Sequence, residues 1–176
     1  RVTAGSTLSP AVLEDLHKIC TTSTEAQSLA EHGRDWWPLA MHWALNGKTP
    51  RKPGAVSTPK TTEQVAALVA ACNKHDLPLT VAGGRSGVCG SAVPLYGGVV
   101  LDVTAMQGIV SVDQVSGIVE VLPGTFGPDF ENELQSKYSL TVGHFPQSFD
   151  ISTVGGWVAC RGAGQYSTRY GKIEDM

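Results

Sequence analysis

The 176-residue sequence lacks several patterns by which common functional classes are identified. No apolar run approaches the roughly 18 residues of a membrane-spanning helix, and the N-terminus has no signal-peptide hydrophobic region. Lys and Arg are scattered, and the formal net charge of −3 leaves no basic face of the kind that binds nucleic acid. We therefore expect no membrane span and no nucleic-acid partner.

Paired cysteines are also lacking. Cys20, Cys72, Cys89 and Cys160 lie far apart in the sequence, and no CxxC pair occurs. This spacing fits reduced thiols in a cytosolic compartment better than a disulfide framework, so we expect a cytoplasmic protein. The five histidines show no mutual ligand spacing, and we expect no metal site.

Three familiar site motifs are absent. No GxGxxG occurs, which excludes the Rossmann fingerprint, and no GxSxG elbow anchors a serine hydrolase. Gly47-Lys48-Thr49 is similar to the end of a P-loop, but His42 stands where the earlier glycine is required.

What is present is a mixture of helix and strand patterns. Ser9 and Pro10 predict a helix start, and Thr61 or Thr62 predicts another. The segment after Trp43 is interpreted as a surface connection, and the final Tyr170-Gly171-Lys172-Ile173 as the approach to a further strand. Helices are expected over 9–19, 24–32, 61–74 and 128–137, and strands over 77–81, 98–104, 108–113 and 117–124, the last two as a hairpin.

Two glycine-rich stretches, Gly83–Gly90 and Gly155–Gly164, leave two interpretations open. Glycine permits tight turns, and it also lets a ligand touch the main chain, where successive N–H groups bind anions. A single loop favours a turn. Two loops, the second opening with Ser152-Thr153 at a helix start, favour a dinucleotide pyrophosphate shared by both.

The runs GGRSGVCG at 83–90, LDVT at 101–104, PGTFGPDFENEL at 123–134 and residues 141–175 carry a family resemblance. The pattern Gly–His–x–Pro–x–Ser–x–x–x–Ser–Thr–Val–Gly–Gly–Trp is matched from Gly143 to Trp157. These runs resemble the FAD-binding domain of the vanillyl-alcohol-oxidase or PCMH type, particularly that of alkylglycerone-phosphate synthase and bacterial FAD-linked oxidases.

The resemblance covers residues 55–176 and implies an α+β fold with two lobes that hold FAD between them. Residues 55–104 would form a first lobe of parallel strands with helices. Residues 105–176 would form a second, mainly antiparallel lobe, incomplete at its C-terminus. Residues 1–54, where the resemblance is weak, would be a helical lead-in.

The resemblance also implies which residues contact FAD. The loop from Val81 to Gly87 would wrap the pyrophosphate, and Ser152 and Thr153 would lie near phosphate or ribityl. The predicted cofactor-binding residues are Val81, Ala82, Gly83, Gly84, Arg85, Ser86, Gly87, Pro146, Gln147, Ser148, Asp150, Ser152, Thr153, Gly155, Gly156, Cys160, Arg161, Gly162 and Ala163.

Three side chains near these positions leave alternatives open. Arg161 suits the anionic reduced flavin ring, or else it forms a surface salt bridge. Arg85 contacts phosphate, or it is not needed because main-chain N–H groups suffice. His144 either hydrogen-bonds the cofactor or braces its loop, and bracing is favoured.

Covalent flavin attachment is not expected. Relatives that attach flavin through histidine carry an R-S-G-G-H run, whereas Arg85 here begins the run R-S-G-V-C. We interpret Cys89 as a small buried thiol. The expected cofactor is therefore non-covalent FAD.

The family transfers electrons or carbanion equivalents through FAD. The resemblance implies a flavin-dependent oxidoreductase or an alkylglycerone-phosphate synthase-like enzyme. A small-molecule substrate would bind through a cap domain outside these residues, so no catalytic residue is assigned and this segment alone is expected to be inactive. The complete protein is a candidate homodimer. Alternatives are an FAD-linked 2-hydroxy-acid dehydrogenase of the lactate or glycolate type, a nucleotide-binding module without catalysis, and a purely structural domain.

Overall fold

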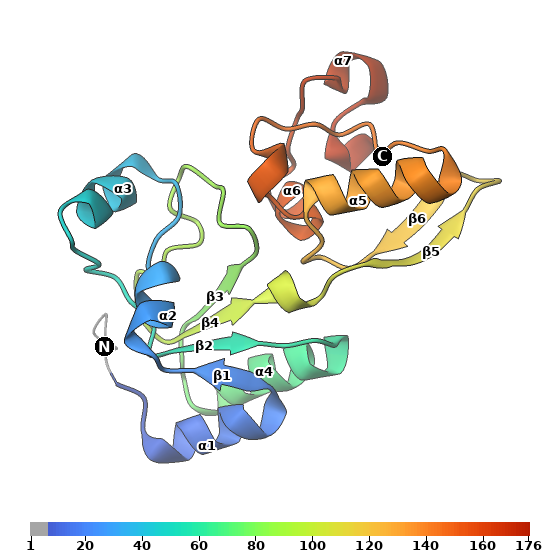
Figure 1. The fold of residues 1–176 in the computed structure, drawn as a ribbon. Coiled ribbons are helices and arrows are strands. Elements are labelled where there is room, and N and C mark those ends of the chain that lie inside the picture. Colours follow the sequence, from blue (N-terminus) through green and yellow to red (C-terminus); the bar gives the residue numbers. More distant parts are fainter. Residues whose placement is uncertain (1–6) are drawn as a thin grey trace. The chain divides into compact units, whose positions relative to one another are not determined.

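The computed structural model describes residues 7–176 and divides the chain into two compact units at Ala105 and Met106 (Figure 1). The first unit contains α1 (Pro10–Ile19), β1 (Thr21–Ser23), α2 (Ala26–Glu31), α3 (Pro38–Leu45), β2 (Ala55–Thr58), α4 (Thr62–Lys74), β3 (Leu79–Ala82), β4 (Val99–Asp102) and a 3-10 turn (Val103–Ala105). The second contains β5 (Ile109–Asp113), β6 (Ile118–Val121), α5 (Gly127–Glu133), a π-helical turn (Leu134–Tyr138), a 3-10 turn (Phe149–Ile151), α6 (Val154–Cys160), α7 (Ser167–Tyr170) and a final 3-10 turn (Ile173–Asp175).

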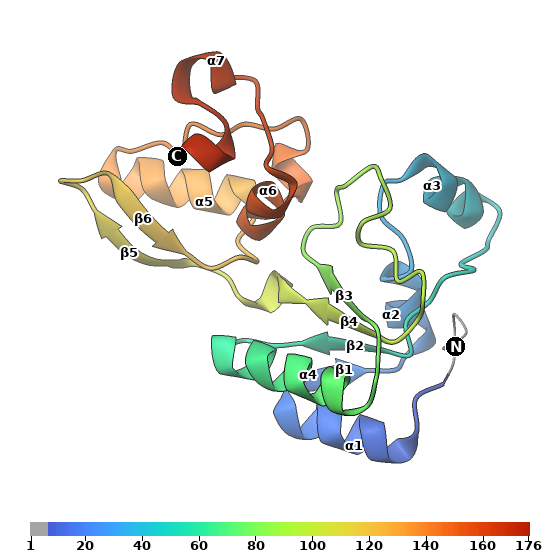
Figure 2. The same ribbon diagram turned by 180° about the vertical axis from the view of Figure 1, so that it is seen from behind.

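The first unit is a four-stranded sheet in the order β1-β2-β4-β3, covered by helices on both faces (Figures 1 and 2). Strands β2, β4 and β3 run parallel, and β1 pairs antiparallel with β2 at one edge. Alternate β4 residues face opposite layers: Val99 and Leu101 pack with α1 and α4, whereas Val100 packs on the side of Leu29 from α2. This two-sided burial is expected of parallel strands.

Local sequence signals start and stop the helices of this unit. The Ser9 hydroxyl accepts from the Val12 N–H at 3.4 Å at the start of α1, and Thr61 accepts from the Gln64 N–H at 3.3 Å at the start of α4. Both contacts are N-caps that satisfy an otherwise unpaired amide. Asp76, with a φ of 50°, reverses the chain after α4.

The second unit packs α5 and α6 against the β5–β6 hairpin. Phe130, Leu134, Val154 and Trp157 form its buried centre. An isolated antiparallel bridge between Phe126 and Thr153 joins the start of α5 to the start of α6.

The α+β class, the parallel first sheet and the hairpin confirm the predictions from sequence. Three details differ. The expected helical lead-in also supplies strand β1, because Thr21–Ser23 pair with β2. Helix α3 begins at Pro38, a residue suited to a first helical position. The end of the chain forms the turn Ile173–Asp175 rather than an approach to a strand.

Candidate functional site

The first glycine-rich loop begins where β3 ends. Ala82, the last residue of β3, pairs in parallel register with Asp102, the last residue of β4. The loop therefore leaves the carboxyl edge of a parallel sheet, which is where ligands bind in open α/β sheets.

Backbone conformation does not explain most glycines of this loop. Gly83, Gly84 and Gly87 lie outside the left-handed region, whereas Arg85 adopts a φ of 53°. Gly90 is the one glycine of this loop with a positive φ, 81°, a conformation that favours glycine. A left-handed backbone conformation therefore does not account for the first three glycines, and Ser91 Oγ lies 3.3 Å from the point that a Cβ on Gly87 would occupy.

The same loop presents unpaired main-chain donors. Within residues 7–176, no backbone N–H from Gly83 through Gly90 donates a hydrogen bond to the protein. Two of its carbonyls are paired: Gly87 O accepts from Trp36 N at 3.0 Å, and Gly90 O accepts from Val93 N at 3.1 Å. Successive free N–H groups around a left-handed residue form a concavity that suits an anion.

Charged groups lie beside the loop, and several already pair with the protein. The Arg85 guanidinium donates to the Glu31 carbonyl at the end of α2. Burial lowers the pKa of Arg85, and the charge of Asp102 opposes this shift. His32 Nε2 lies 3.0 Å from Asp102 Oδ2, and its Nδ1 lies 2.9 Å from Ser28 O.

Asp102 keeps a lowered pKa although it is largely buried. Burial raises its pKa, but hydrogen bonds from His32 and from the Thr104 backbone outweigh that effect. The carboxylate next to the loop is thus ionised and already hydrogen-bonded within the protein.

The second glycine-rich stretch has a different structure. The Val154 N–H donates to Thr125 O at 3.0 Å, and the Gly155 N–H donates to Pro123 O at 2.9 Å. A Cβ on Gly155 would lie 2.7 Å from Pro123 Cβ. The expectation of free N–H groups at this helix start is therefore wrong at these two positions, because carbonyl oxygens of the turn at 123–125 accept both hydrogen bonds.

Two neighbouring hydroxyls at this helix start differ in their partners. Ser152 Oγ accepts from the indole Nε1 of Trp157 at 2.6 Å. Thr153 Oγ1 is buried and has no hydrogen-bond partner among the described residues. A Cβ on Gly156 would have only this Thr153 oxygen within reach, at 3.5 Å. Thr153 Oγ1 is thus the hydroxyl oxygen of this helix start that lacks a protein partner among the described residues.

His144 is fully buried, and neither ring nitrogen has a hydrogen-bond partner in the described part of the chain. Its ring meets Trp157 edge-on at a centroid distance of 5.0 Å. Burial lowers its pKa below the ordinary value, which keeps the ring neutral at pH 7. Any bracing by His144 therefore acts through packing.

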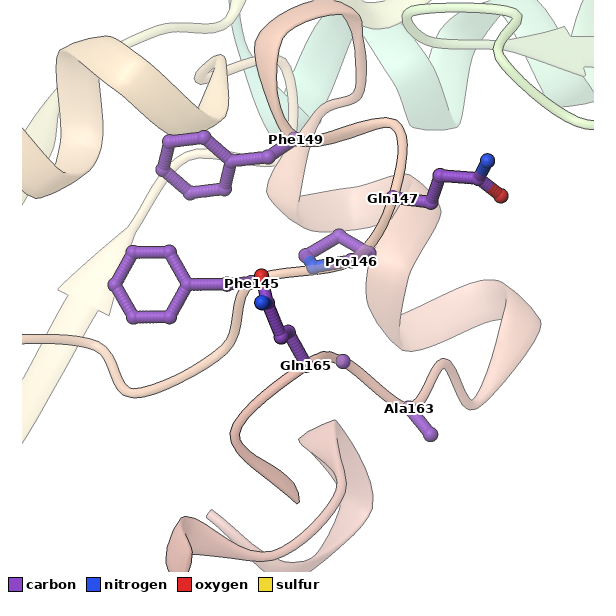
Figure 3. A pocket seen from close by; sticks show the side chains of 7 residues that line it. Phe145, Pro146, Gln147, Phe149, Ala163 and Gln165 are labelled. Atoms are coloured by element: carbon purple, nitrogen blue, oxygen red, sulfur yellow. The ribbon is translucent and has the colours of Figure 1, made fainter. Parts of the chain in front are cut away.

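A hollow of about 700 Å³ lies beside this segment in the second unit (Figure 3). The rings of Phe145 and Phe149 point the same way from the chain, opposite to Gln147, and their centroids are 5.2 Å apart. The lining residues are Phe145, Pro146, Gln147, Phe149, Ala163, Gly164 and Gln165.

Pro146, Gln147 and Ala163 are thus brought together as predicted lining residues of one hollow. Phe145, Gly164 and Gln165, which also line the hollow, were not among the predicted residues. Their sequence signal is weak, because Phe is common in protein cores and Gln is common on protein surfaces without any role in binding.

The other predicted residues are more dispersed. Ser148 precedes the turn Phe149–Ile151, and Asp150 is exposed within it. Cys160 ends α6 and is exposed, and Gly162 lies with its Cβ position 3.5 Å from His144 Nε2. In the first unit Val81 is exposed, Ala82 is buried, and Ser86 is partly buried.

Arg161 and Cys89 are both exposed in the structure. Arg161, with a φ of 51°, forms an exposed ion pair with Glu174, so its guanidinium already has a partner. Cys89 is exposed, which corrects the expectation of a buried thiol: it lies in the loop and not in the sheet. All four cysteines are free.

Residues 7–176 contain neither a candidate membrane span nor a cluster of metal ligands. No helix in this range has the length and apolar character needed to cross a bilayer. No group of three or more His, Cys, Asp or Glu side chains in this range could hold a metal ion.

Comparisons with known proteins identify the family. A family profile described as FAD binding domain matches residues 53–176. Alkyldihydroxyacetonephosphate synthase of Trypanosoma brucei brucei is 32% identical over 148 residues, which is 81% of this chain and 23% of that protein. D-lactate dehydrogenase of Anaerostipes hadrus is 32% identical over 132 residues, which is 75% of this chain and 27% of that protein.

A solved structure of alkyldihydroxyacetonephosphate synthase has the same fold, with a TM-score of 0.89 and 24% identity. The match covers all of this chain and 37% of that one. The chain thus spans about a quarter of the length of the curated relatives it matches.

In the first unit, the unpaired N–H groups of the glycine loop fit an anionic group such as a phosphate. Together with the profile match over residues 53–176, they lead to one conclusion: the chain belongs to the FAD binding domain family, and FAD is its cofactor.

Proposed function

We propose that this chain is the FAD-binding part of a flavin-dependent enzyme similar to alkyldihydroxyacetonephosphate synthase, and that it holds FAD without a covalent bond. The observation that carries the proposal is the run of unpaired N–H groups from Gly83 to Gly90. Such groups bind a pyrophosphate without needing a cationic side chain. This agrees with the Arg85 guanidinium being directed to the Glu31 carbonyl.

In the second unit, the residues proposed to contact the cofactor are Thr153 and the lining of the hollow in Figure 3. Thr153 offers a hydroxyl that has no competing partner among residues 7–176. Phe145 and Phe149 would exclude water from one side, and Gln147 and Gln165 would supply amide groups. The remaining predicted contacts include Ser152, whose oxygen already accepts from Trp157 Nε1, and Gly155, whose N–H already donates to Pro123 O; they stay proposals.

FAD, once bound, supplies electron transfer or the stabilisation of a carbanion. The residues of this chain would bind and orient it, and His144 would remain neutral because its pKa is lowered. Substrate-binding and acid–base residues, a small-molecule substrate and a homodimer are proposed for the complete protein. Non-covalent binding is supported by the sequence Arg85-Ser86-Gly87-Val88-Cys89, which lacks the attachment histidine of some relatives.

A second candidate is an FAD-linked dehydrogenase of 2-hydroxy acids. It is favoured by the 32% identity with D-lactate dehydrogenase, which equals the identity with the synthase. Both candidates use the same cofactor site. Adding D-lactate or glycolate to the FAD-loaded full chain separates them, since bleaching of the flavin absorbance is expected only for a dehydrogenase.

The proposed cofactor site is tested by titrating the purified full chain with FAD and following the flavin absorbance between 300 and 550 nm, roughly the ordinary flavin window. We expect saturable binding that ADP competes with, because both share the pyrophosphate. Riboflavin, which lacks phosphate, should compete poorly. Acid precipitation should release the flavin into the supernatant.

Gly84→Val provides the matched test of the loop. Gly84 does not have a positive φ, so valine adds bulk without forcing the backbone out of the left-handed region. We expect FAD affinity to fall at least about tenfold, which corresponds to about 1.4 kcal/mol. Ala70→Val, which adds the same side chain on an exposed part of α4, should bind FAD normally. Equal binding by both variants would contradict the proposed loop.

A further inference from the structure

The short segment Asp35–Trp37 lies against the glycine loop inside the first unit. The Trp36 N–H donates to Gly87 O at 3.0 Å. The Trp37 ring lies 3.0 Å from the point that a Cβ on Gly90 would occupy. This segment precedes residues 53–176, the range that the family profile matches.

Asp35 determines how this segment is presented. Its carboxylate is 1% exposed, and Oδ1 accepts from the Trp37 N–H at 2.9 Å. An aspartate that bonds the backbone two residues later closes a local turn. The turn fixes the direction of the Trp36 N–H and the position of the Trp37 ring.

The contact at Gly87 affects the orientation of the loop amides. A trans peptide places its C=O and N–H on opposite sides, and no peptide bond in the described residues is cis. When Trp36 holds Gly87 O, the N–H of Val88 in the same peptide group faces away from the segment. The brace therefore acts on the carbonyl side and leaves the amide side free.

The second oxygen of Asp35 has no hydrogen-bond partner among residues 7–176. It lies 3.9 Å from the point that a Cβ on Gly87 would occupy, so it faces the loop. A buried oxygen without a donor reduces stability, and such groups in native structures call for a functional explanation. Packing alone does not explain an aspartate at this position.

We infer that Asp35 is a positioning residue of the FAD site. It holds Trp36 and Trp37 against the carbonyl side of the glycine loop, so that the loop presents its N–H groups to the pyrophosphate. The inference rests on the proposed function of that loop.

The test compares Asp35→Ala and Asp35→Asn in the full chain, with affinities for FAD and ADP measured by quenching of flavin fluorescence and by competition. Alanine removes the acceptor of the Trp37 N–H, so the loop is no longer held in one orientation. Both affinities should therefore fall about tenfold, an effect of the size expected from losing roughly one hydrogen bond. Asparagine keeps an acceptor oxygen and should restore both affinities to within about threefold of the wild type.

Val12→Ala is the control for simple destabilisation. Val12 is buried in the layer formed by α1 and α4, on the other face of the sheet from α2. It should lower the unfolding midpoint and leave FAD affinity unchanged.

Three results would overturn the inference: wild-type affinity in Asp35→Ala, no recovery in Asp35→Asn, or an equal loss of affinity in Val12→Ala. Absence of FAD binding by the wild-type chain would overturn the proposed function and this inference with it. Weakened binding in Gly84→Val with unchanged binding in Asp35→Ala would overturn the inference alone.

Discussion

At the scale of single residues, the glycines of this chain fall into separate physical classes. Gly83 and Gly84 have no positive φ, whereas Gly155 lacks space for a Cβ beside Pro123. The sequence alone could not separate these classes, because it shows where glycines occur but not their backbone angles or their neighbours in space. The unpaired amides of the first loop agree with the predicted anion site, whereas the paired amides at the start of α6 do not.

Gly98 belongs to a third class in which both constraints act together. It has a φ of 70°, and a Cβ there would lie 2.0 Å from Pro78 O. Gly98→Ala should therefore separate β4 from the start of β3 and lower the free energy of unfolding by about 3 kcal/mol or more. Urea unfolding followed by circular dichroism measures this loss.

Gly47→Ala is the control for backbone strain alone. Gly47 has a φ of 64°, and a Cβ there would have nothing within 4 Å. We expect a loss of about 1 kcal/mol. If the two variants lost equal stability, the close approach to Pro78 would not be the cause.

At the scale of elements, capping residues and periodicity predicted much of the fold. Ser9, Thr61 and the hairpin at 109–121 were readable because their signals are local. Strand β1 was not, since Thr21–Ser23 is too short to show a period and gains its structure from pairing with β2. Helix α3 was not predicted, because its 8 residues are too few to show a clear helical period.

The docking of α6 yields a prediction with opposite signs at adjacent positions. Gly155→Ala should lower the free energy of unfolding by about 1 to 3 kcal/mol, because its methyl group would overlap Pro123. Gly156→Ala has room and lies within the helix, so it should raise stability by about 0.5 to 1 kcal/mol.

Urea unfolding of both variants measures these changes. A loss of stability at both positions would show that the whole start of α6 lacks space for a side chain, contrary to the described geometry.

At the scale of the whole molecule, pH should affect stability through the contact between α1 and α4. Asp15 accepts from Lys74 Nζ at 2.7 Å and lies 2.9 Å from His75 Nε2. The hydrogen bonds from Lys74 and His75 lower its pKa from 3.8 to about 2. Because the folded-state pKa is depressed, the contribution is complete above pH 4, roughly the unfolded value, and is lost as the pH falls through about 2.

Asp15→Asn should accordingly lower the thermal unfolding midpoint slightly at pH 6, since the group is exposed, and the difference from wild type should shrink as the pH falls toward about 2. Glu25→Gln, which removes an exposed carboxylate without an ion pair among the described residues, is the control for the loss of a surface charge. A difference that persisted unchanged at pH 2 would contradict the proposed role of the Asp15 charge.

The division at Ala105 also has a consequence for synthesis. Every strand of the first sheet, and the Asp35 segment that braces its loop, lies before Met106. A growing chain therefore contains all hydrogen-bonding partners of that sheet before the hairpin of the second unit has been translated. Since domains generally fold as units during synthesis, N-terminal first, the glycine loop that we propose binds phosphate can be in place on the ribosome while the second unit is still being made.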